Sequence, residues 1–425
     1  MLKDLSKTEL ETLYESLRKE YDGFKEKGLK LDISRGKPAK EQLALSMDIF
    51  KVLTEDSDMV SEDGFDTRNY GCLTGIAEGK RLMADLMDVK PEQVIVFGGS
   101  SLNIMYDTVA KAMLHGVCGH TPWGKLPSVK FLCPVPGYDR HFSVTEALGI
   151  EMINIPMNED GPDMDLVEKY VESDPAVKGI WCVPKYGNPT GIVYSDEVVK
   201  RFAALKPAAP DFRIFWDNAY NVHHLDVDKP CEILNILEEA EKAGNPDIVY
   251  VFGSYSKITF PGSSVSGLAS SPANLKDIQS QMNFQTIGHN KISQLMHARY
   301  FPDKKALMDH MRKHAAIMKP KFDMVEKVLT EELGGQGAGT WTQPQGGYFV
   351  SFNTVPGCAK RVAELVKAAG VTMTGAGATF PYHKDPEDRN IRIAPSFASV
   401  ADLEAALKIF ALVVKMVTIE KLLEK

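Results

Sequence analysis

The chain has 425 residues, of which 44% are hydrophobic and 25% are charged, a composition typical of a folded globular protein. Its formal net charge of −8 argues against a nucleic-acid-binding protein, which needs a basic face. The charged N-terminal segment argues against a signal peptide, and no run approaches the roughly 18 apolar residues of a transmembrane helix. The six cysteines lack paired spacing, so we expect reduced thiols and a cytoplasmic protein.

The first predicted elements are a helix and an extended segment. Ser6 and Glu9 have the spacing of a capping box, which predicts a helix that runs to about Lys27. Residues 31–38 contain Gly and Pro and are expected to be extended. From residue 94 onward, short apolar runs alternate with helical periods, as in a buried parallel sheet covered by helices. The predicted strands are residues 94–97, 129–132, 152–155, 179–183, 213–216 and 248–252.

The C-terminal third has a different pattern. Residues 308–332 predict one long helix, and Gly-rich turns, a helix from Ala359, a strand at Arg392 and a terminal helix from Ser399 follow it. We therefore predict an α/β fold whose large domain, residues 51–305, has a mostly parallel central sheet covered by helices. A smaller α+β domain would combine an N-terminal arm, residues 1–50, with residues 306–425.

Lys257 ends the motif Ser254-Tyr255-Ser256-Lys257, which directly follows a predicted strand. Open α/β sheets bind ligands at the carboxyl ends of their strands. A loop lysine is ordinarily a solvated surface charge. The alternative is a Schiff-base lysine, whose amine must be neutral to attack a carbonyl group and so benefits from a partly desolvated pocket.

Asp217 and Asn188 also follow predicted strands. Asp217 is either a turn residue that ends its strand or a carboxylate that keeps a pyridinium nitrogen protonated. Asn188 begins Asn-Pro-Thr-Gly, a strong turn signal, and its amide could also donate to a phenolate oxygen on a bound ring.

Two further motifs could bind anions. Gly98-Gly99-Ser100-Ser101 is either a plain turn between a strand and a helix or a phosphate cradle of backbone N–H groups and hydroxyls. It lacks the lysine and the spacing of a nucleotide P-loop. Arg392 lies in an apolar strand and needs a partner if it is buried, either a structural carboxylate or that of a substrate.

Together these motifs resemble those of fold-type I pyridoxal-phosphate (PLP) enzymes, in particular the class I aminotransferases. The resemblance extends from about Arg35 to the C-terminal helix. Its specific set consists of residues 188–191, Asp217 with Tyr220, and residues 254–257, in this order and separation. The segments 34–38, 100–107 and 256–260 are most similar to the divergent aspartate aminotransferase subgroup called type Ic.

The resemblance implies a role for each matching residue. Lys257 would hold PLP as a Schiff base and act as the general base that moves the substrate proton. Asp217 would pair with the pyridine nitrogen, Asn188 and Tyr220 would hydrogen-bond the ring oxygen O3′, and Tyr138 would stack on the ring. The residues expected at the phosphate are Gly99, Ser100, Ser101, Ser254 and Ser256, together with the partner subunit's Tyr70.

The substrate would bind between these residues and the C-terminal third. Arg392 would bind its α-carboxylate, with Gly36, Arg35 and Asn188 beside it. Since the tyrosine at position 70 acts across the subunit interface in this family, the resemblance implies a homodimer with active sites at that interface.

Val265 departs from the family pattern. Members usually have an arginine eight residues after the lysine, where it pairs with the phosphate, and this chain has Val265 there. The divergent subgroup also lacks the arginine, so the departure favours that subgroup. His115 and His120 do not have a standard zinc spacing, and we expect no metal site.

The reaction implied is ping-pong transamination, in which L-aspartate and 2-oxoglutarate yield an oxo acid and L-glutamate. Alternatives are an aminotransferase for aromatic amino acids or 2-aminoadipate, a PLP β-lyase, and, more remotely, a non-catalytic PLP-sensing module. The last would carry a winged-helix DNA-binding domain, for which the residues before Arg35 are too few and too acidic. The distal carboxylate of aspartate would need a second cation, for which the candidates are Arg35, Lys37, Arg140, His141, Lys185 and Arg299.

Overall fold

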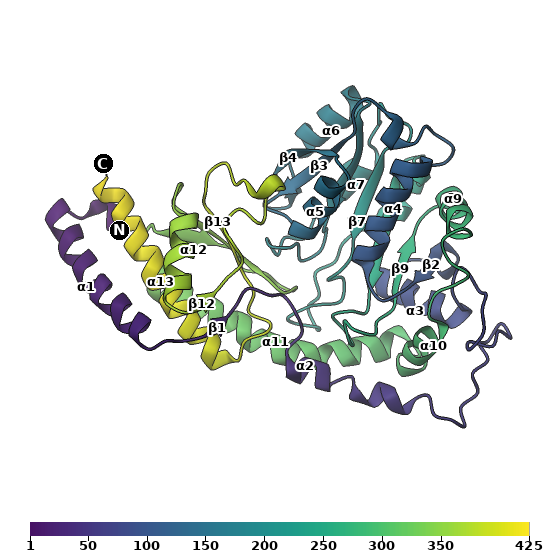
Figure 1. The fold of residues 1–425 in the computed structure, drawn as a ribbon, viewed down its shortest axis with the longest axis horizontal. Helices are drawn as coiled ribbons and strands as arrows, with labels where there is room; N and C mark the ends of the chain where they lie inside the picture. Colours follow the sequence, from purple (N-terminus) through teal and green to yellow (C-terminus); the bar gives the residue numbers. More distant parts are fainter. Residues whose placement is uncertain (425) are drawn as a thin grey trace.

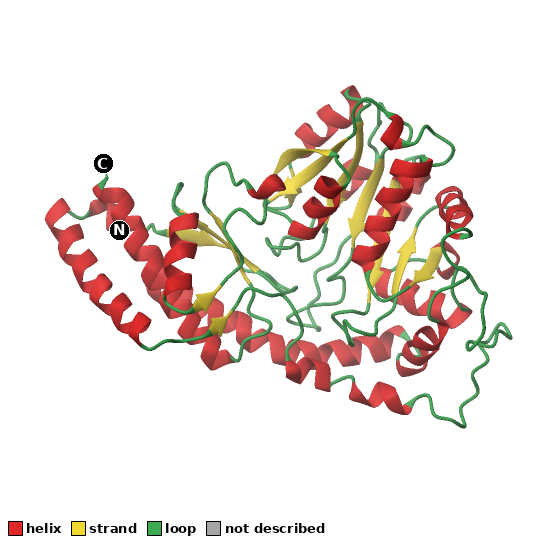
Figure 2. Ribbon diagram, in the orientation of Figure 1, coloured by secondary structure: helices red, strands yellow, loops and turns green. Residues whose placement is uncertain are grey.

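The structure is a computed structural model that describes residues 1–424. It has two lobes, each with its own sheets, and the long helix α11 (Lys304–Leu333) runs along both of them (Figure 1). Figure 2 shows that helices lie outside the strands in the larger lobe and on one side of them in the smaller lobe. Within the described residues, no helix is both long enough and apolar enough to span a bilayer.

The larger lobe contains an eight-stranded sheet with the order β2-β9-β8-β7-β6-β3-β4-β5. Strands β8, β7, β6, β3 and β4 are parallel, whereas β9 is antiparallel to both of its neighbours and β5 is antiparallel to β4. The predicted mostly parallel sheet is therefore confirmed. Its strands are β2 (Val94–Phe97), β3 (Lys130–Val135), β4 (Glu151–Asn158), β5 (Gly161–Pro162), β6 (Val177–Cys182), β7 (Arg213–Asp217), β8 (Val249–Ser254) and β9 (Ser266–Ala269).

Helices cover both faces of this sheet, which explains why its strands are apolar on both sides. In β2, for example, Val94 and Val96 belong to the core on one face, and Ile95 and Phe97 belong to the core on the other. The first face is covered by α3 (Ala77–Met87), α6 (Met164–Ser173), α7 (Asp196–Ala203) and α8 (Ile236–Lys242). The second is covered by α4 (Ser101–His115), α5 (Asp139–Ala147) and α9 (Pro272–Met282), and α10 (Lys291–Tyr300) packs against α3.

The smaller lobe combines the two ends of the chain. Its strands are β10 (Gly339–Trp341), β11 (Val350–Thr354) and β13 (Asn390–Ile393), which form an antiparallel sheet, and β1 (Leu31–Asp32), which pairs in parallel with β12 (Val371–Thr372). Its helices are α1 (Lys7–Glu26), α12 (Ala359–Ala368) and α13 (Val400–Leu423), and the short α2 (Lys40–Ala44) leads into the larger lobe. The capping box at Ser6 and Glu9 is present at the start of α1.

One strand of the fold was not expected from the sequence, and one helix spans an expected domain boundary. Strand β9 was not expected, because Ser266–Ala269 offers no pattern of large apolar side chains. Helix α11 starts at Lys304, and its residues pack into the cores of both lobes, so it crosses the division expected at residue 305. We retain the division of the chain at residues 50 and 305 as a proposal.

Candidate active site

The candidate active site lies where three neighbouring parallel strands end. Strands β6, β7 and β8 are adjacent in the sheet, so their carboxyl ends share one edge. Asn188 follows β6, Asp217 is the last residue of β7, and Lys257 follows Ser254 at the end of β8. This topology brings together three residues that are up to 69 positions apart in the sequence.

Lys257 lies in a setting that favours its neutral form. Its Nζ is 5.0 Å from the centroid of the Tyr220 ring. Burial lowers the pKa of Lys257, and the nearby negative charge of Asp217 opposes that shift in part. A lysine with a lowered pKa has more free amine at neutral pH and is therefore a better nucleophile and base.

Asp217 is buried, and its two carboxylate oxygens have different surroundings. Oδ2 is 3.0 Å from Nε2 of His141, whose ring stacks on Trp181 with centroids 4.5 Å apart. Oδ1 is buried and has no hydrogen-bond partner within residues 1–424. An unpaired buried carboxylate oxygen is costly, so this atom calls for a donor.

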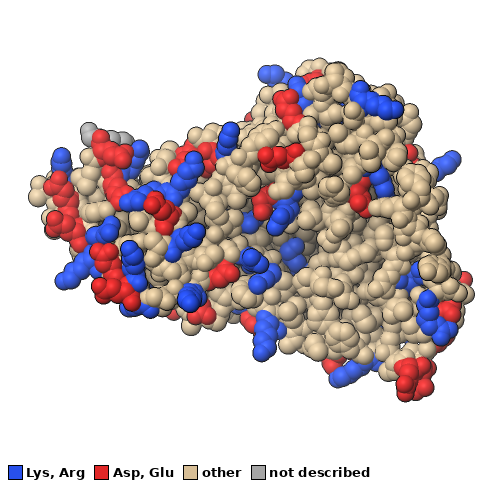
Figure 3. Space-filling model, in the orientation of Figure 1, with Lys and Arg blue, Asp and Glu red and all other residues tan. Residues whose placement is uncertain are grey.

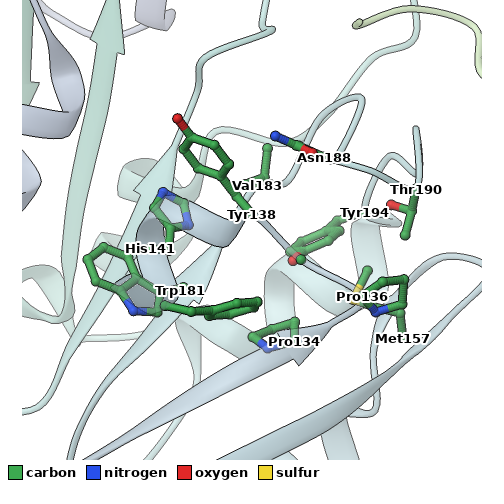
Figure 4. A pocket seen from close by; sticks show the side chains of 13 residues that line it. Pro134, Pro136, Tyr138, His141, Met157, Trp181, Val183, Asn188, Thr190 and Tyr194 are labelled. Carbon is green, nitrogen blue, oxygen red and sulfur yellow. The ribbon is translucent and has the colours of Figure 1, made fainter. Parts of the chain in front are cut away.

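Tyr138 and Tyr220 lie close enough to Asp217 for its charge to affect their pKa values, and Asn188 lines the same pocket as Tyr138. Burial raises the pKa of Tyr138 to about 12 and also raises that of Tyr220, so both hydroxyls stay protonated and are able to donate. The Oδ1 atom of Asn188 accepts a hydrogen bond from Arg392 at 3.1 Å, which leaves its Nδ2 as the donor. Figure 4 shows Tyr138 and Asn188 at one end of a pocket, with His141 and Trp181 beside Tyr138.

The glycine-serine turn forms the start of the 15-residue helix α4. Ser100 is the N-cap residue but makes no side-chain capping bond, and Ser101 is the first helical residue, so hydroxyls and N–H groups lie at the positive end of the helix dipole. Ser256 donates from Oγ to the carbonyl oxygen of Gly99 at 2.9 Å. Ser254 is at the adjacent end of β8. These are the features of an anion cradle.

Val265 is buried in the apolar core of the larger lobe and offers no charge to the cradle. His289, which the sequence did not single out, lies next to the glycine-serine turn. Its Nδ1 is 4.0 Å from the position that a Cβ atom would have on Gly98. Its Nε2 is buried and has no partner in the described part of the chain. No motif marks this histidine, because it follows a loop that is distant from the turn in sequence.

Arg392 lies on β13 and reaches from the smaller lobe to the larger one. Its Nη1 is 2.8 Å from Oδ1 of Asp139, its Nη2 donates to Thr374 at 3.3 Å, and its guanidinium lies 4.8 Å from the Phe349 ring centroid. A Cβ atom on Gly36 would lie 2.1 Å from that ring, so only glycine fits where the segment 34–38 passes Phe349. The structure thus brings Gly36, Asn188 and Arg392 together.

The structure separates the candidates for a second cation. Lys185 is buried near His224, whose pKa is lowered to about 4 by burial and, to a smaller extent, by the charge of Lys185. Arg299 donates to the carbonyl oxygen of Asp58 on the outside of the larger lobe. His141 is committed to Asp217. These three are therefore not available to a substrate beside Arg392, and Arg35, Lys37 and Arg140 remain.

The remaining candidate cations are exposed. Arg35 and Lys37 flank Gly36 and are exposed, and Arg140 is exposed on α5 next to Asp139. Figure 3 shows a hollow between the two lobes with Lys and Arg side chains around it. Such a recess suits an anionic small molecule.

A buried polar cluster holds the backbone that carries Lys257. Tyr348 donates from its hydroxyl to the carbonyl oxygen of Lys257 at 3.3 Å and accepts a bond from Gln42 at 3.0 Å. His310 and His314 approach the carbonyl oxygen of Ile258 with Nε2 at 3.1 and 3.0 Å. Burial and the neighbouring His310 lower the pKa of His314 to about 4, so it is neutral near pH 7. Sequence reasoning missed this cluster.

Tyr70 is not part of the site within one chain. Its side chain is 81% exposed on the loop before α3. Its predicted role at the phosphate therefore depends on a second subunit.

Comparisons with known proteins identify the family. The family model described as aspartate amino-transferase matches residues 5–425. An aspartate aminotransferase from Corynebacterium glutamicum is 47% identical over 407 residues, which are 96% of this chain and 94% of the relative. The crystal structure of an aspartate transaminase from C. glutamicum has a TM-score of 0.96 at 46% identity and covers 99% of each chain.

A more distant structure shares the fold alone. An α-aminoadipate aminotransferase from Thermus thermophilus, complexed with N-(5′-phosphopyridoxyl)-L-leucine, has a TM-score of 0.72 at 17% identity over 92% of this chain and 93% of its own. The architecture is thus that of the fold-type I aminotransferases. Within that class, the chain belongs to the aspartate amino-transferase family and is an enzyme that transfers amino groups. The resemblance stated from the sequence is confirmed, whereas the roles of individual residues stay predictions.

Proposed function

We propose that the enzyme uses PLP to transfer the amino group of L-aspartate to 2-oxoglutarate, with an oxo acid and L-glutamate as products. The observation that carries the PLP proposal is the buried, unpartnered Oδ1 of Asp217 in the neighbourhood of Lys257. Aspartate as the donor is supported by the name and the 47% identity of the C. glutamicum relative.

The residues of the site fit PLP. A protonated pyridine nitrogen would give Asp217 Oδ1 the donor that it lacks, and His141 would hold the other oxygen in place. The hydroxyl of Tyr220 and Nδ2 of Asn188 are the donors for O3′, and Tyr138 is the aromatic ring for stacking. Bound PLP would serve as the electron sink for the carbanion that forms when the substrate loses its α-proton.

Lys257 would have two successive tasks. As a free amine it would attack the carbonyl carbon of the cofactor, which its lowered pKa favours. Once an amino acid has displaced it, the same amine would take the α-proton and return it one position away. The cluster of Gln42, Tyr348 and His314 would keep the Lys257 backbone fixed during both steps.

The phosphate would bind at the start of α4. Backbone N–H groups at Gly99, Ser100 and Ser101 and the hydroxyls of Ser254 and Ser256 supply donors without the arginine that Val265 replaces. Arg392 would bind the substrate α-carboxylate with its fork of N–H groups. One of Arg35, Lys37 and Arg140 would bind the distal carboxylate.

We also propose a cytoplasmic homodimer in which the partner subunit's Tyr70 completes the phosphate site. The 81% exposure of the tyrosine in each chain supports this assembly. The segment from Phe284 to Ile292 lies beside the same loop, since Lys291 donates from Nζ to the carbonyl oxygen of Gly71 at 3.0 Å. Phe284 and Ile287 are 68% and 63% exposed, as expected for side chains that a second subunit covers.

A titration with twenty amino acids tests the proposed substrate. The visible absorption of the PLP-loaded enzyme should change at the lowest concentration with L-aspartate or L-glutamate, because only these donors carry a second carboxylate for the recess. A stronger response to an aromatic amino acid, or to 2-aminoadipate titrated beside the twenty as a longer dicarboxylic donor, would replace aspartate as the donor. Release of ammonia and an oxo acid without a second substrate would indicate a β-lyase.

A further inference from the structure

The arginine proposed for the substrate already holds a carboxylate of the protein itself. Oδ1 of Asp139 is 2.8 Å from Nη1 of Arg392, and the side chains are 24% and 8% exposed. Within residues 1–424, Arg392 is the one ion-pair partner of Asp139. The two residues come from different lobes, because Asp139 opens α5 and Arg392 lies on β13.

Arg392 has spare hydrogen-bonding capacity around this pair. Nη1 also donates to Asn188 and Nη2 to Thr374, while Nε is buried and unpartnered in the described structure. A guanidinium binds a carboxylate best through two parallel N–H groups, and the single contact with Asp139 does not use that fork. A substrate carboxylate could therefore make a better pair than Asp139 does.

Two carboxylates cannot share Nη1 without repulsion, so the entry of one favours the departure of the other. Asp139 is the member of the pair that is able to leave, because it is three times as exposed as Arg392 and opens a helix next to solvent-exposed Arg140. Arg392 is held by Asn188, Thr374 and the face of Phe349 and would stay in place.

We propose that Asp139 is an internal competitor for the α-carboxylate of the substrate. It neutralises Arg392 and bridges the two lobes when no substrate is present, and the substrate displaces it. Asp139 is thus a positioning residue that sets the affinity for both the amino acid and the oxo acid. The inference rests on the proposed role of Arg392. An internal pair that is closed about nine-tenths of the time weakens the apparent affinity roughly tenfold.

The test is the binding of succinate to the PLP-loaded enzyme by titration calorimetry. Succinate carries two carboxylates but neither an amino nor an oxo group, so it is not turned over. We expect Asp139→Asn to bind succinate roughly tenfold more tightly than the wild type. Asp139→Ser, which also removes the charge and suits a helix start, should show the same gain and serves if the first variant is unstable.

Matched variants separate this effect from a change in net charge. Glu146→Gln removes one negative charge from the same helix at an exposed position, and it should bind succinate as the wild type does. In steady-state assays, Asp139→Asn should lower KM for the amino acid and for the oxo acid in parallel and leave kcat within about twofold, because both substrates carry the same carboxylate. A purely structural role would not lower both KM values.

Arg392→Gln distinguishes failure of the inference from failure of the proposed site. It should weaken succinate binding, and Asp139→Asn should then have no further effect in that background. Unchanged or weaker succinate binding by Asp139→Asn in the presence of Arg392 would overturn the inference, because Asp139 would then be inert or would orient Arg392. Unchanged binding by Arg392→Gln would instead refute the proposed α-carboxylate site.

Discussion

The two walls of the candidate active site differ in how firmly their polar groups are held. The wall from the larger lobe consists of groups that are buried and fixed before any ligand arrives, such as Asp217 with His141 and the backbone of Lys257 with its polar cluster. The wall from the smaller lobe consists of exposed cations and of one arginine whose partner belongs to the other lobe. A cofactor that stays bound needs a rigid site, whereas substrates that enter and leave in every cycle need a site that is able to change partners.

Replacing Lys257 should have the largest effect of all. Lys257→Ala removes both the nucleophile and the base, so transamination should fall by at least about 10³-fold. Single-turnover conversion of aspartate by the PLP-loaded variant is the measurement. The thermal midpoint of the cofactor-free protein should not fall, since burial of the Lys257 amine is unfavourable for its charged form. Retained turnover would mean that another group does the chemistry.

Asp217→Ala should cause the second-largest loss of activity. In this variant His141 loses its carboxylate partner, and so does the proposed pyridine nitrogen. We expect kcat to fall by about 10²- to 10³-fold and PLP to be lost more readily on dialysis. His141→Phe keeps the carboxylate and the ring that stacks on Trp181, so it should lose less than tenfold. Equal losses in the two variants would contradict the assignment of Asp217 to the cofactor.

Replacing Arg392, in the wall from the smaller lobe, should reduce activity less. Arg392→Lys keeps the positive charge but loses the planar fork, so KM for both substrates should rise about 10- to 100-fold. The fall in kcat should be smaller than the rise in KM, because the cofactor side is untouched. If kcat fell more than KM rose, Arg392 would belong functionally with the cofactor-binding wall from the larger lobe.

The polar cluster of Gln42, Tyr348 and His314 should affect mainly the pH dependence of the free energy of unfolding. Because the pKa of His314 is about 4 in the folded protein against 6.5 in the unfolded chain, the unfolded state binds more protons between these values. The stability that neutral His314 provides is therefore complete above pH 6.5 and is lost as the pH falls toward 4. The loss should reach about 3 kcal/mol at most.

Urea unfolding of the wild type and of His314→Asn at several pH values measures this contribution. The variant should be less stable near pH 7, since the carbonyl oxygen of Ile258 loses a donor, but its stability should depend less on pH below 6.5. An identical pH dependence of stability in the two proteins would show that His314 does not contribute to it.

The sequence predicted the wall from the larger lobe better than the wall from the smaller lobe. Asp217, Asn188 and Lys257 follow strands that are apolar on both faces, and parallel strands bring their ends to one edge, so the local pattern implied the tertiary arrangement. The resemblance to a family then suggested what the three residues do. His141 was considered only as a substrate-binding cation, although its position three residues after Tyr138 places both on one face of a helical turn.

What the sequence could not predict depends on contacts between distant segments. The pair of Asp139 and Arg392 spans 253 positions, and the bond between Gln42 and His314 spans 272. No period or motif connects such residues, because their approach depends on how the two lobes pack. The small residues of β9 gave no strand signal for a related reason: their pairing with β2 and β8 determines their conformation.

The most direct test of the central claim is to reduce the PLP-loaded enzyme with borohydride and to locate the modified peptide by mass spectrometry. Reduction makes a covalent link between PLP and an amine permanent. We predict one phosphopyridoxyl group per chain, on Lys257, and none on Lys257→Ala treated in the same way. A label on another lysine, or equal labelling of the variant, would contradict it.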